Sequence, residues 1–459
     1  MVGNQAESVI LAKHALTADG WRDDVAVAIG GQGRIASVTA NDPRAASSNT
    51  VLLPALANLH SHSFQRAMAG MTEHRFEGRD SFWSWRTLMY RFLDKMNPDQ
   101  QEAVAALTFM EMQEAGYASV GEFHYVHHQP GGAAYDRLSE TSDHICAAAA
   151  ETGIGLTHLP VLYSFGGAGK QDLAGGQLRF GNTPDQFAAL HEQATQSVRA
   201  VNSDAAIGIA PHSLRATCPE HLTKAAIDYA SGPVHIHISE QTKEVEEIEA
   251  WLGARPVEWL LENTQVGKNW CLIHATHMTE AETIGTAKAG AVAGLCPITE
   301  GNLGDGIFDG VRFIGAGGAY GIGSDSNVRI TLAEELRTLE YSQRLRDRSR
   351  NAMLTGEGST GEALYTTAAT GGAQAMGRPS GAIRVGDWAD LTALDLNARP
   401  FWGLSRNQLM DGWIFAGDDA VVSDVWSAGR HMVQNGVHIG RDAILARFRK
   451  VMAELTGAL

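Results

Sequence analysis

The stretch TVLLPALANLHSH, residues 50–62, is an apolar run that ends in two histidines one residue apart. Seven further short apolar runs follow it, and helical or loop segments separate them. They are YASVGEFHYV (117–126), GIGLTHLPVLYS (153–164), AAIGIAPHSL (205–214), PVHIHISE (233–240), NWCLIHAT (269–276), AVAGLCPIT (291–299) and GAYGIGSDS (318–326). This repeated alternation of strand and helix predicts an α/β fold, a (β/α)8 TIM barrel, whose site lies at the carboxyl ends of its strands.

The two ends of the chain carry β-rich segments of a different kind. They are residues 8–40 near the start, and 381–396 with 421–439 near the end. Neither buries enough surface alone, so we expect both to pair into one small β-sandwich domain. The predicted division assigns 1–54 and 381–440 to the sandwich and 55–380 to the barrel, and 441–459 has the apolar spacing of an amphipathic C-terminal helix.

Composition limits the partners that this chain could have. Its formal net charge of −16 at pH 7 argues against binding nucleic acid or an anionic membrane surface. The four cysteines stand apart without a CxxC pair, which is typical of a reducing compartment. No signal peptide is evident, and no apolar run approaches the roughly 18 residues of a membrane span. We therefore expect a soluble, cytoplasmic protein.

Several strand ends carry residues that bind metals. Successive side chains of a strand alternate between its faces, so His60 and His62 point the same way, into the barrel mouth. His237 closes the fifth run, His274 closes the sixth, and Asp325 lies in the eighth. Three imidazoles and one carboxylate, with space for water, are typical of a catalytic zinc site. We expect one Zn²⁺ per chain, bound by His60, His62, His237 and Asp325.

Other histidines and one loop allow more than one interpretation. His235 shares a strand face with His237 but lies deeper, so we expect a buried, hydrogen-bonded side chain rather than a ligand. The spacing of His124, His127 and His128 fits no common metal site, which favours surface positions or positions that support the site. The glycine-rich stretch 164–177 is either a lid or a disordered connector.

Seven motifs together resemble one family. NLHSHSFQRAMAG, DSFWSWRTLMYR, GEFHYVHH, APHSLRA, VHIHISEQ, LIHATH and GSDSN are similar to the formimidoylglutamate deiminases of the amidohydrolase superfamily. Some members of the superfamily hold two metals through a carboxylated lysine on strand four, and run four here contains no lysine, so a mononuclear site is implied. The implied reaction is hydrolysis of N-formimidoyl-L-glutamate to N-formyl-L-glutamate and ammonia in histidine degradation. A related deaminase acting on a purine or another heterocyclic amidine is the alternative, and a barrel that has lost catalysis is a third.

The chemistry and the resemblance suggest roles for individual residues. Asp325 can accept a proton from the attacking water, and His274 can orient that water. The resemblance implies that Glu240 passes a proton to the departing nitrogen. It also implies that the substrate, a small dicarboxylate, contacts Gln65, Arg86, Tyr125, His212 and Arg215. Arg215 suits a carboxylate because its planar guanidinium can bind both oxygens.

The insertion after the first run is rich in aromatic residues, including Trp83 and Trp85. Such residues suit either the core or a subunit interface. The resemblance implies a homodimer in which this segment sends Arg86 into the active site of the neighbouring subunit. A surface arginine beside core tryptophans is the other interpretation.

Overall fold

A closed parallel barrel forms the centre of the protein. The computed structural model describes residues 6–73 and 82–457, and their side chains over 8–73 and 85–457, so the side chain of Trp83 lies outside the described part. The barrel strands are β5 (Leu56–Ser61), β6 (Tyr117–His124), β7 (Gly155–Leu162), β8 (Ala206–Ile207) continued by β9 (Ala210–Pro211), β10 (Val234–Ile238), β11 (Trp270–His274), β12 (Val292–Leu295) and β13 (Ala319–Ile322). They pair in parallel in the order β10-β11-β12-β13-β5-β6-β7-β8.

Backbone hydrogen bonds beside β10 close the ring. The N–H of Ile209 donates to Pro233 O over 2.9 Å, and the N–H of His235 donates to Ile209 O over 3.0 Å. The fourth strand is interrupted at Gly208, where a Cβ would lie 2.4 Å from Pro233 O. The predicted barrel is therefore confirmed, with its fourth strand in two short pieces.

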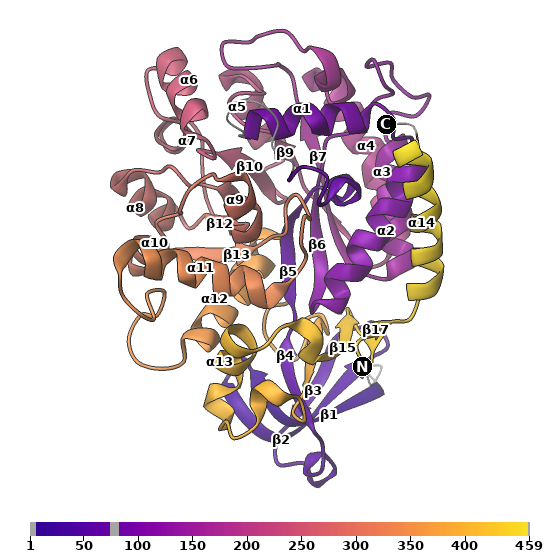
Figure 1. Cartoon of the computed structure of the whole chain (residues 1–459), viewed down its shortest axis with the longest axis vertical. Coiled ribbons are helices and arrows are strands. Elements are labelled where there is room, and N and C mark those ends of the chain that lie inside the picture. Colours follow the sequence, from indigo (N-terminus) through magenta and orange to yellow (C-terminus); the bar gives the residue numbers. More distant parts are fainter. Residues whose placement is uncertain (1–5, 74–81, 458–459) are drawn as a thin grey trace.

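Helices cover the outside of the barrel (Figure 1). The longer ones are α2 (Pro98–Glu114), α3 (Glu140–Thr152), α4 (Pro184–Val201), α5 (Pro219–Asp228), α6 (Thr242–Leu252), α7 (Pro256–Asn263), α8 (Glu280–Ala289), α11 (Leu332–Asp347) and α12 (Thr360–Ala375). The helical pattern over 242–263 divides into α6 and α7. Gly253 ends α6 with a φ of 75°, which glycine adopts readily, and Pro256 begins α7.

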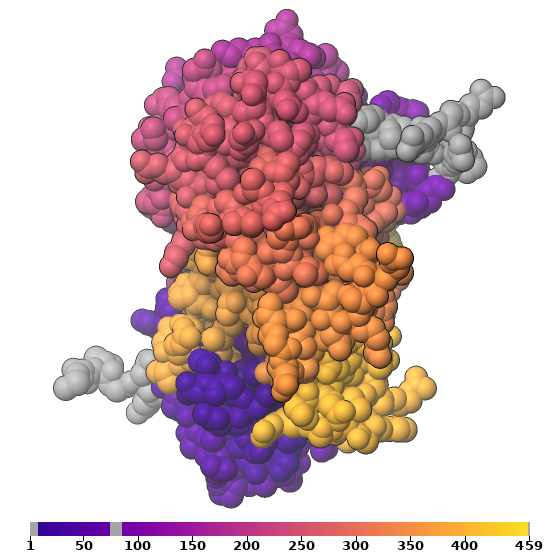
Figure 2. Space-filling model, turned by 90° about the vertical axis from the view of Figure 1, so that its left-hand side faces the viewer, coloured from indigo at the N-terminus to yellow at the C-terminus, as the bar shows by residue number. Residues whose placement is uncertain are grey.

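The two ends of the chain meet in one mixed sheet, as the sequence predicts. Its strands are β1 (Ala6–Thr17), β2 (Gly20–Gly30), β3 (Ile35–Thr39), β4 (Thr50–Pro54), β14 (Leu391–Asp395), β15 (Val422–Ser427), β16 (Arg430–Gln434) and β17 (Val437–His438). Their order is β17-β16-β15-β14-β4-β1-β2-β3, so β4 and β14 join the two halves. Figure 2 shows indigo and yellow segments of the chain, from its first and last parts, side by side at one end of the molecule.

Two helices lie apart from this alternation. Helix α1 (Phe82–Leu93) lies across the end of the barrel that faces away from the mixed sheet (Figure 1). Helix α14 (Arg441–Gly457) runs along α2 and buries Val451 and Leu455. All four cysteines are free and buried. Among the described residues, none of the helices has the length and apolar character needed to cross a membrane.

A buried ion-pair cluster holds the barrel to the mixed sheet. Arg378 Nε donates to Asp390 Oδ2 over 2.6 Å, and Arg378 Nη2 donates to Asp204 Oδ2 over 2.7 Å. The side chains of all three residues are at most 2% exposed. Gly155 begins β7 beside this cluster, where a Cβ would lie 2.6 Å from the guanidinium. The arginine therefore neutralises two carboxylates that have little access to water.

We expect Arg378→Met to lower the free energy of unfolding by about 3–5 kcal/mol, because it leaves the buried Asp390 carboxylate without its cationic partner, whereas Asp204 keeps Arg430. The midpoint of denaturant unfolding measures this loss. Arg384→Met is the control, since the Arg384 side chain is 63% exposed and pairs with Asp387 at 3.6 Å; its change should stay within about 0.5 kcal/mol. Equal stability of the two variants would contradict the assignment.

Candidate metal centre and active site

Three histidines and one aspartate meet at the carboxyl ends of β5, β10 and β13. The Nε2 atoms of His60 and His62 each lie 3.3 Å from Oδ1 of Asp325. His237 Nε2 lies 3.1 Å from His60 Nε2. One ligand atom from each of the four side chains lies within 4.8 Å of the others, and all four residues are buried.

The outer nitrogens of these imidazoles show which atoms face the cluster. His62 Nδ1 donates to the carbonyl oxygen of Phe123 over 2.9 Å, and His237 Nδ1 donates to that of His212 over 3.2 Å. Their Nε2 atoms therefore present lone pairs, as in metal-binding histidines whose other nitrogen donates to a carbonyl. Burial lowers the pKa of His60 to about 3, so this ring is neutral as well.

The four side chains of the cluster therefore direct lone pairs toward one another, and few N–H groups are available to form hydrogen bonds between them. Burial opposes ionisation of Asp325, but its contact with His60 and the positive charge of His274 hold its pKa below the ordinary value. An ionised carboxylate among neutral imidazoles suits a divalent cation, and zinc accepts these ligand types. The residues present therefore fit a mononuclear metal site.

A hydrogen-bonded network fixes the turn that carries Asp325. This residue has a φ of 45°, in the left-handed region that residues other than glycine seldom adopt. Asn327 Nδ2 donates to the Asp325 carbonyl over 3.0 Å and to Ser61 Oγ over 3.1 Å. Ser324 Oγ accepts from Asn58 Nδ2 and donates to Asn327 Oδ1, both over 2.6 Å. These bonds join the end of β13 to β5, so that the carboxylate meets the two histidines.

His274 ends β11 between two carboxyl groups. Its Nδ1 lies 3.2 Å from Glu300 Oε1, and its Nε2 lies 3.9 Å from Glu240 Oε1. Burial opposes a charge on His274, but Glu240, Glu300 and Asp325 raise its pKa to about 10. Burial also raises the pKa of Glu240, against the opposing charges of His274 and Arg215. A cationic imidazole beside such a carboxyl can hold and transfer protons.

Glu300 fixes the orientation of His274. It lies in α9 (Pro297–Leu303), and its Oε1 also accepts from the N–H of Cys296 over 2.9 Å. His274, Cys296 and Glu300 form a second group close enough to hold a cation. The Glu300 carboxylate already accepts hydrogen bonds from His274 and from the N–H of Cys296. We therefore infer that Glu300 positions His274 and does not bind a metal.

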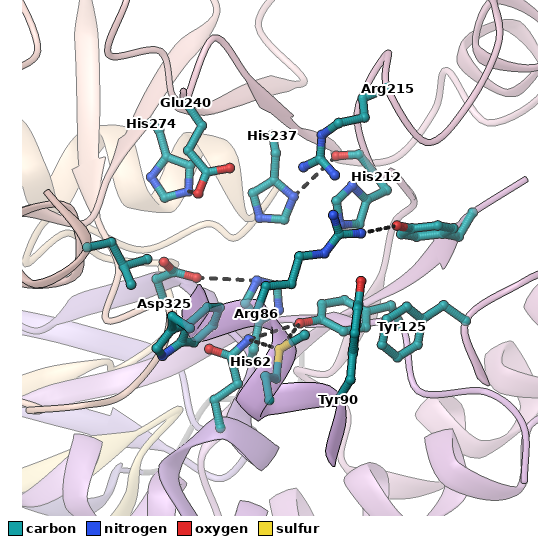
Figure 3. Close-up of a pocket in the computed structure, with 16 residues that line it drawn as sticks. His62, Arg86, Tyr90, Tyr125, His212, Arg215, His237, Glu240, His274 and Asp325 are labelled. Atoms are coloured by element: carbon teal, nitrogen blue, oxygen red, sulfur yellow. Dashed lines mark hydrogen bonds and ion pairs between the residues drawn. The ribbon is translucent and has the colours of Figure 1, made fainter. Parts of the chain in front are cut away.

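Another wall of the pocket carries two guanidinium groups. Arg86 comes from α1 and Arg215 from the loop after β9, and both line a cavity with about 520 Å³ of empty space. Arg86 Nη2 donates to the Tyr163 hydroxyl over 3.2 Å. Figure 3 shows the two guanidinium groups close together, near His212 and His237. Arg86 thus lies in the pocket of its own chain, whereas the resemblance led us to expect it in the neighbour's.

Every predicted site residue except the fully buried His60 lines this cavity. Gln65 Nε2 donates to the Tyr125 hydroxyl over 2.9 Å. The sequence interpretation missed the other lining residues, which are Trp85, Met89, Tyr90, Tyr163, Phe180 and Leu303. Only Tyr90 had a usable signal, because it follows Arg86 by four residues and so shares its face of a helix.

Two expectations about other histidines have different outcomes. His235 Nε2 donates to the carbonyl oxygen of Ala375 over 2.9 Å, which confirms a buried, hydrogen-bonded side chain. For His124, His127 and His128 we expected surface positions or positions that support the site, and the surface positions are wrong, since none of the three is more than 5% exposed. The backbone N–H groups of His127 and His128 both donate to Arg179 O, so the segment that follows the glycine-rich stretch covers them.

The glycine-rich stretch 164–177 forms a folded loop rather than a disordered connector. Gly167 and Gln171 form a β-bridge within it. Gln177 Nε2 donates to Gly166 O over 2.9 Å and to the Tyr163 hydroxyl over 3.3 Å. A Cβ on Gly176 would lie 2.7 Å from the Tyr90 ring, so the loop packs directly against α1.

Comparisons with known proteins agree with this geometry. Residues 51–432 match the amidohydrolase family, and residues 7–48 match the N-terminal domain of formimidoylglutamate deiminase HutF. A formimidoylglutamate deiminase from Pseudomonas aeruginosa is 45% identical over 98% of this chain and 99% of its own.

Two solved structures share the fold. An amidohydrolase from Brucella melitensis has a TM-score of 0.93 and 47% identity, covering 98% of this chain and 100% of its own. An adenosine deaminase from Xanthomonas campestris with bound zinc has a TM-score of 0.81 and 22% identity, covering 98% of each chain, and shows the fold alone. The chain therefore belongs to the amidohydrolase family and, within it, to the formimidoylglutamate deiminases.

Proposed function

We propose that this chain hydrolyses N-formimidoyl-L-glutamate to N-formyl-L-glutamate and ammonia, a step of histidine degradation, with one Zn²⁺ per chain. The observation that carries the proposal is a pocket in which Arg86 and Arg215 share a cavity with a metal-binding set of residues. The Pseudomonas aeruginosa deiminase, 45% identical, supports this substrate. The four free, buried cysteines support a cytoplasmic location.

Each polar group of the barrel mouth has a step to perform. His60, His62, His237 and Asp325 would hold the zinc ion, which when bound would lower the pKa of a water and so make it available as the nucleophile. Asp325 accepts a proton from the water as it attacks the formimidoyl carbon. His274 orients that water through Nε2 and stabilises the developing negative charge. The departing nitrogen receives two protons, one from Glu240 and the one that Asp325 took from the water, so that ammonia leaves as the C–N bond breaks. The hydroxyl proton of the tetrahedral centre returns to Glu240 as the formyl C=O forms.

The substrate is a dicarboxylate, whereas the chain has a net charge of −16. The overall field therefore repels the substrate, and local cations must compensate. Arg215 and Arg86 provide these charges, and a guanidinium can bind a carboxylate through two parallel hydrogen bonds. Gln65 Oε1 is buried and has no hydrogen-bond partner in the part of the chain that is described, which leaves it available to an N–H of the substrate.

A deaminase acting on a purine or another heterocyclic amidine is the second candidate, favoured by the shared fold of the adenosine deaminase. A neutral ring does not require two guanidinium groups, so Arg86 and Arg215 argue against it. If the protein deaminates adenosine but does not hydrolyse N-formimidoyl-L-glutamate, the heterocyclic deaminase becomes the first candidate.

The ligand set predicts that chelation abolishes activity and that one Zn²⁺ per chain restores it. His237→Asn should lose the metal because it removes one ligand, while His235→Asn, changed on the same strand, should keep it. Metal analysis of the purified variants measures both. Two ions per active chain, or a fully active metal-free protein, would contradict a mononuclear site.

The assignment of Glu240 as proton donor predicts both the products and the effect of its loss. Mass analysis should find N-formyl-L-glutamate and ammonia, and Glu240→Gln should lower kcat by about 10²–10⁴-fold with zinc still bound. Glutamate and formamide as products would mean that the other C–N bond breaks. A near-normal kcat in Glu240→Gln would remove this residue from the mechanism.

The position of Arg86 predicts the outcome of subunit mixing in the homodimer that we propose from the resemblance. Arg86→Ala and Glu240→Ala, each nearly inactive, are mixed and reassembled, and differently tagged chains verify the exchange. Because Arg86 lies in its own chain's pocket, every site in the mixture lacks one group, and we expect no recovery. Recovery to about a quarter of wild type, with about half of the dimers mixed, would show that the arginine acts across the interface.

A further inference from the structure

The hydroxyl of Tyr90 is a polar group that the proposed mechanism does not use. Tyr90 lies on α1, and the Arg86 guanidinium carbon is 5.2 Å from the centroid of its ring. Its hydroxyl oxygen is buried, and its O–H has no acceptor among residues 6–73 and 82–457. Figure 3 shows this hydroxyl pointing toward Arg86 and the cavity. A buried polar group without a partner is rare in folded proteins and calls for an explanation.

The hydroxyl of Tyr163 accepts two hydrogen bonds but donates none to a described residue. Its hydroxyl oxygen accepts from Arg86 Nη2 over 3.2 Å and from Gln177 Nε2 over 3.3 Å. A phenol has two acceptor lone pairs and one donor, so both contacts use lone pairs and leave the O–H to donate. Tyr163 is 1% exposed and lines the same cavity as Tyr90. Two phenol O–H groups and two guanidinium groups thus line one cavity, and no described residue accepts a hydrogen bond from either phenol.

The surroundings of both rings keep them in place. Gly176 comes so close to the Tyr90 ring that a Cβ there would lie 2.7 Å from it. Gln177, the next residue, donates to Tyr163. Burial raises the pKa of Tyr90 above its ordinary value, so its phenol keeps the proton that it would donate. The glycine-rich loop therefore holds both tyrosines against the pocket.

We propose that Tyr90 and Tyr163 are specificity-determining residues that donate hydrogen bonds to a carboxylate of the ligand held by Arg86 and Arg215. The proposal rests on the dicarboxylate substrate proposed above and names the part of it that the two phenols recognise. One carboxylate has lone pairs for two phenols and a guanidinium at once, whereas a neutral ring has no such group.

The test measures binding, which does not depend on turnover. Titration calorimetry compares N-formyl-L-glutamate with N-formyl-4-aminobutyrate, which lacks the α-carboxylate, and N-formyl-L-2-aminobutyrate, which lacks the side-chain carboxylate. We expect Tyr90→Phe and Tyr163→Phe each to weaken binding of N-formyl-L-glutamate by about 10-fold or more, because each removes a hydrogen bond to a charged group. One of the two truncated ligands lacks the carboxylate that the tyrosines recognise. For that ligand, the tyrosine substitutions should weaken binding by about twofold or less.

Arg215→Met is the positive control, and Tyr341→Phe is the matched control, because Tyr341 is 40% exposed on α11 and lies outside the pocket. With N-formimidoyl-L-glutamate as substrate, the tyrosine variants should raise KM and leave kcat within about threefold, as expected for lost binding.

Unchanged binding of N-formyl-L-glutamate in both tyrosine variants would overturn the proposal, and so would an equal loss for all three ligands. The protein could bind N-formyl-L-glutamate, with the expected effects of both tyrosine substitutions, and still not hydrolyse N-formimidoyl-L-glutamate. In that case the proposed function fails and the proposed carboxylate recognition stands.

Discussion

The convergence of three imidazoles and one carboxylate on one point is the constraint that shapes the mouth of this barrel. Their closest atoms are 3.1–3.3 Å apart, inside a region with little access to water. Such crowding persists only where the backbone enforces it, and three nearby strand ends have φ values of 45–67°, at Ser239, His274 and Asp325. The hydrogen-bonded strands of the barrel supply the rigidity that holds these four side chains together.

The parts of the site that lie on strands could be predicted from the sequence, because alternation along a strand fixes where its side chains point. His60 and His62 meet on this basis, with ring centroids 4.7 Å apart. The strand order of a parallel barrel then places His237 and Asp325 near them. The same reasoning divided the chain between barrel and mixed sheet, although the first run contributes to both, because β4 ends at Pro54 and β5 begins at Leu56.

The walls of the pocket could not be predicted in this way, because loops and α1 build them. No periodicity connects Tyr163 with Arg86, whose contact spans 77 positions of the chain. The path of the glycine-rich loop depends on packing against α1, and the segment that follows this loop covers His127 and His128. The place of Arg86 in the pocket of its own chain could not be predicted from motifs either, since it depends on the direction in which α1 crosses the barrel.

The pairing of β4 with β14 has a consequence for the order in which this protein can mature. Leu391 of β14 lies opposite Pro54 of β4. The sheet that β1–β4 begin is therefore complete only after β14–β17 have been synthesised. During synthesis the edge of β4 has no permanent partner while the whole barrel emerges. Contacts so distant in sequence form slowly, and an unpaired edge is a template for association with other chains. Barrel strand β5 follows β4 directly in the chain. Closure of the barrel before β14 is synthesised would therefore keep the edge of β4 in its position until β14 pairs with it.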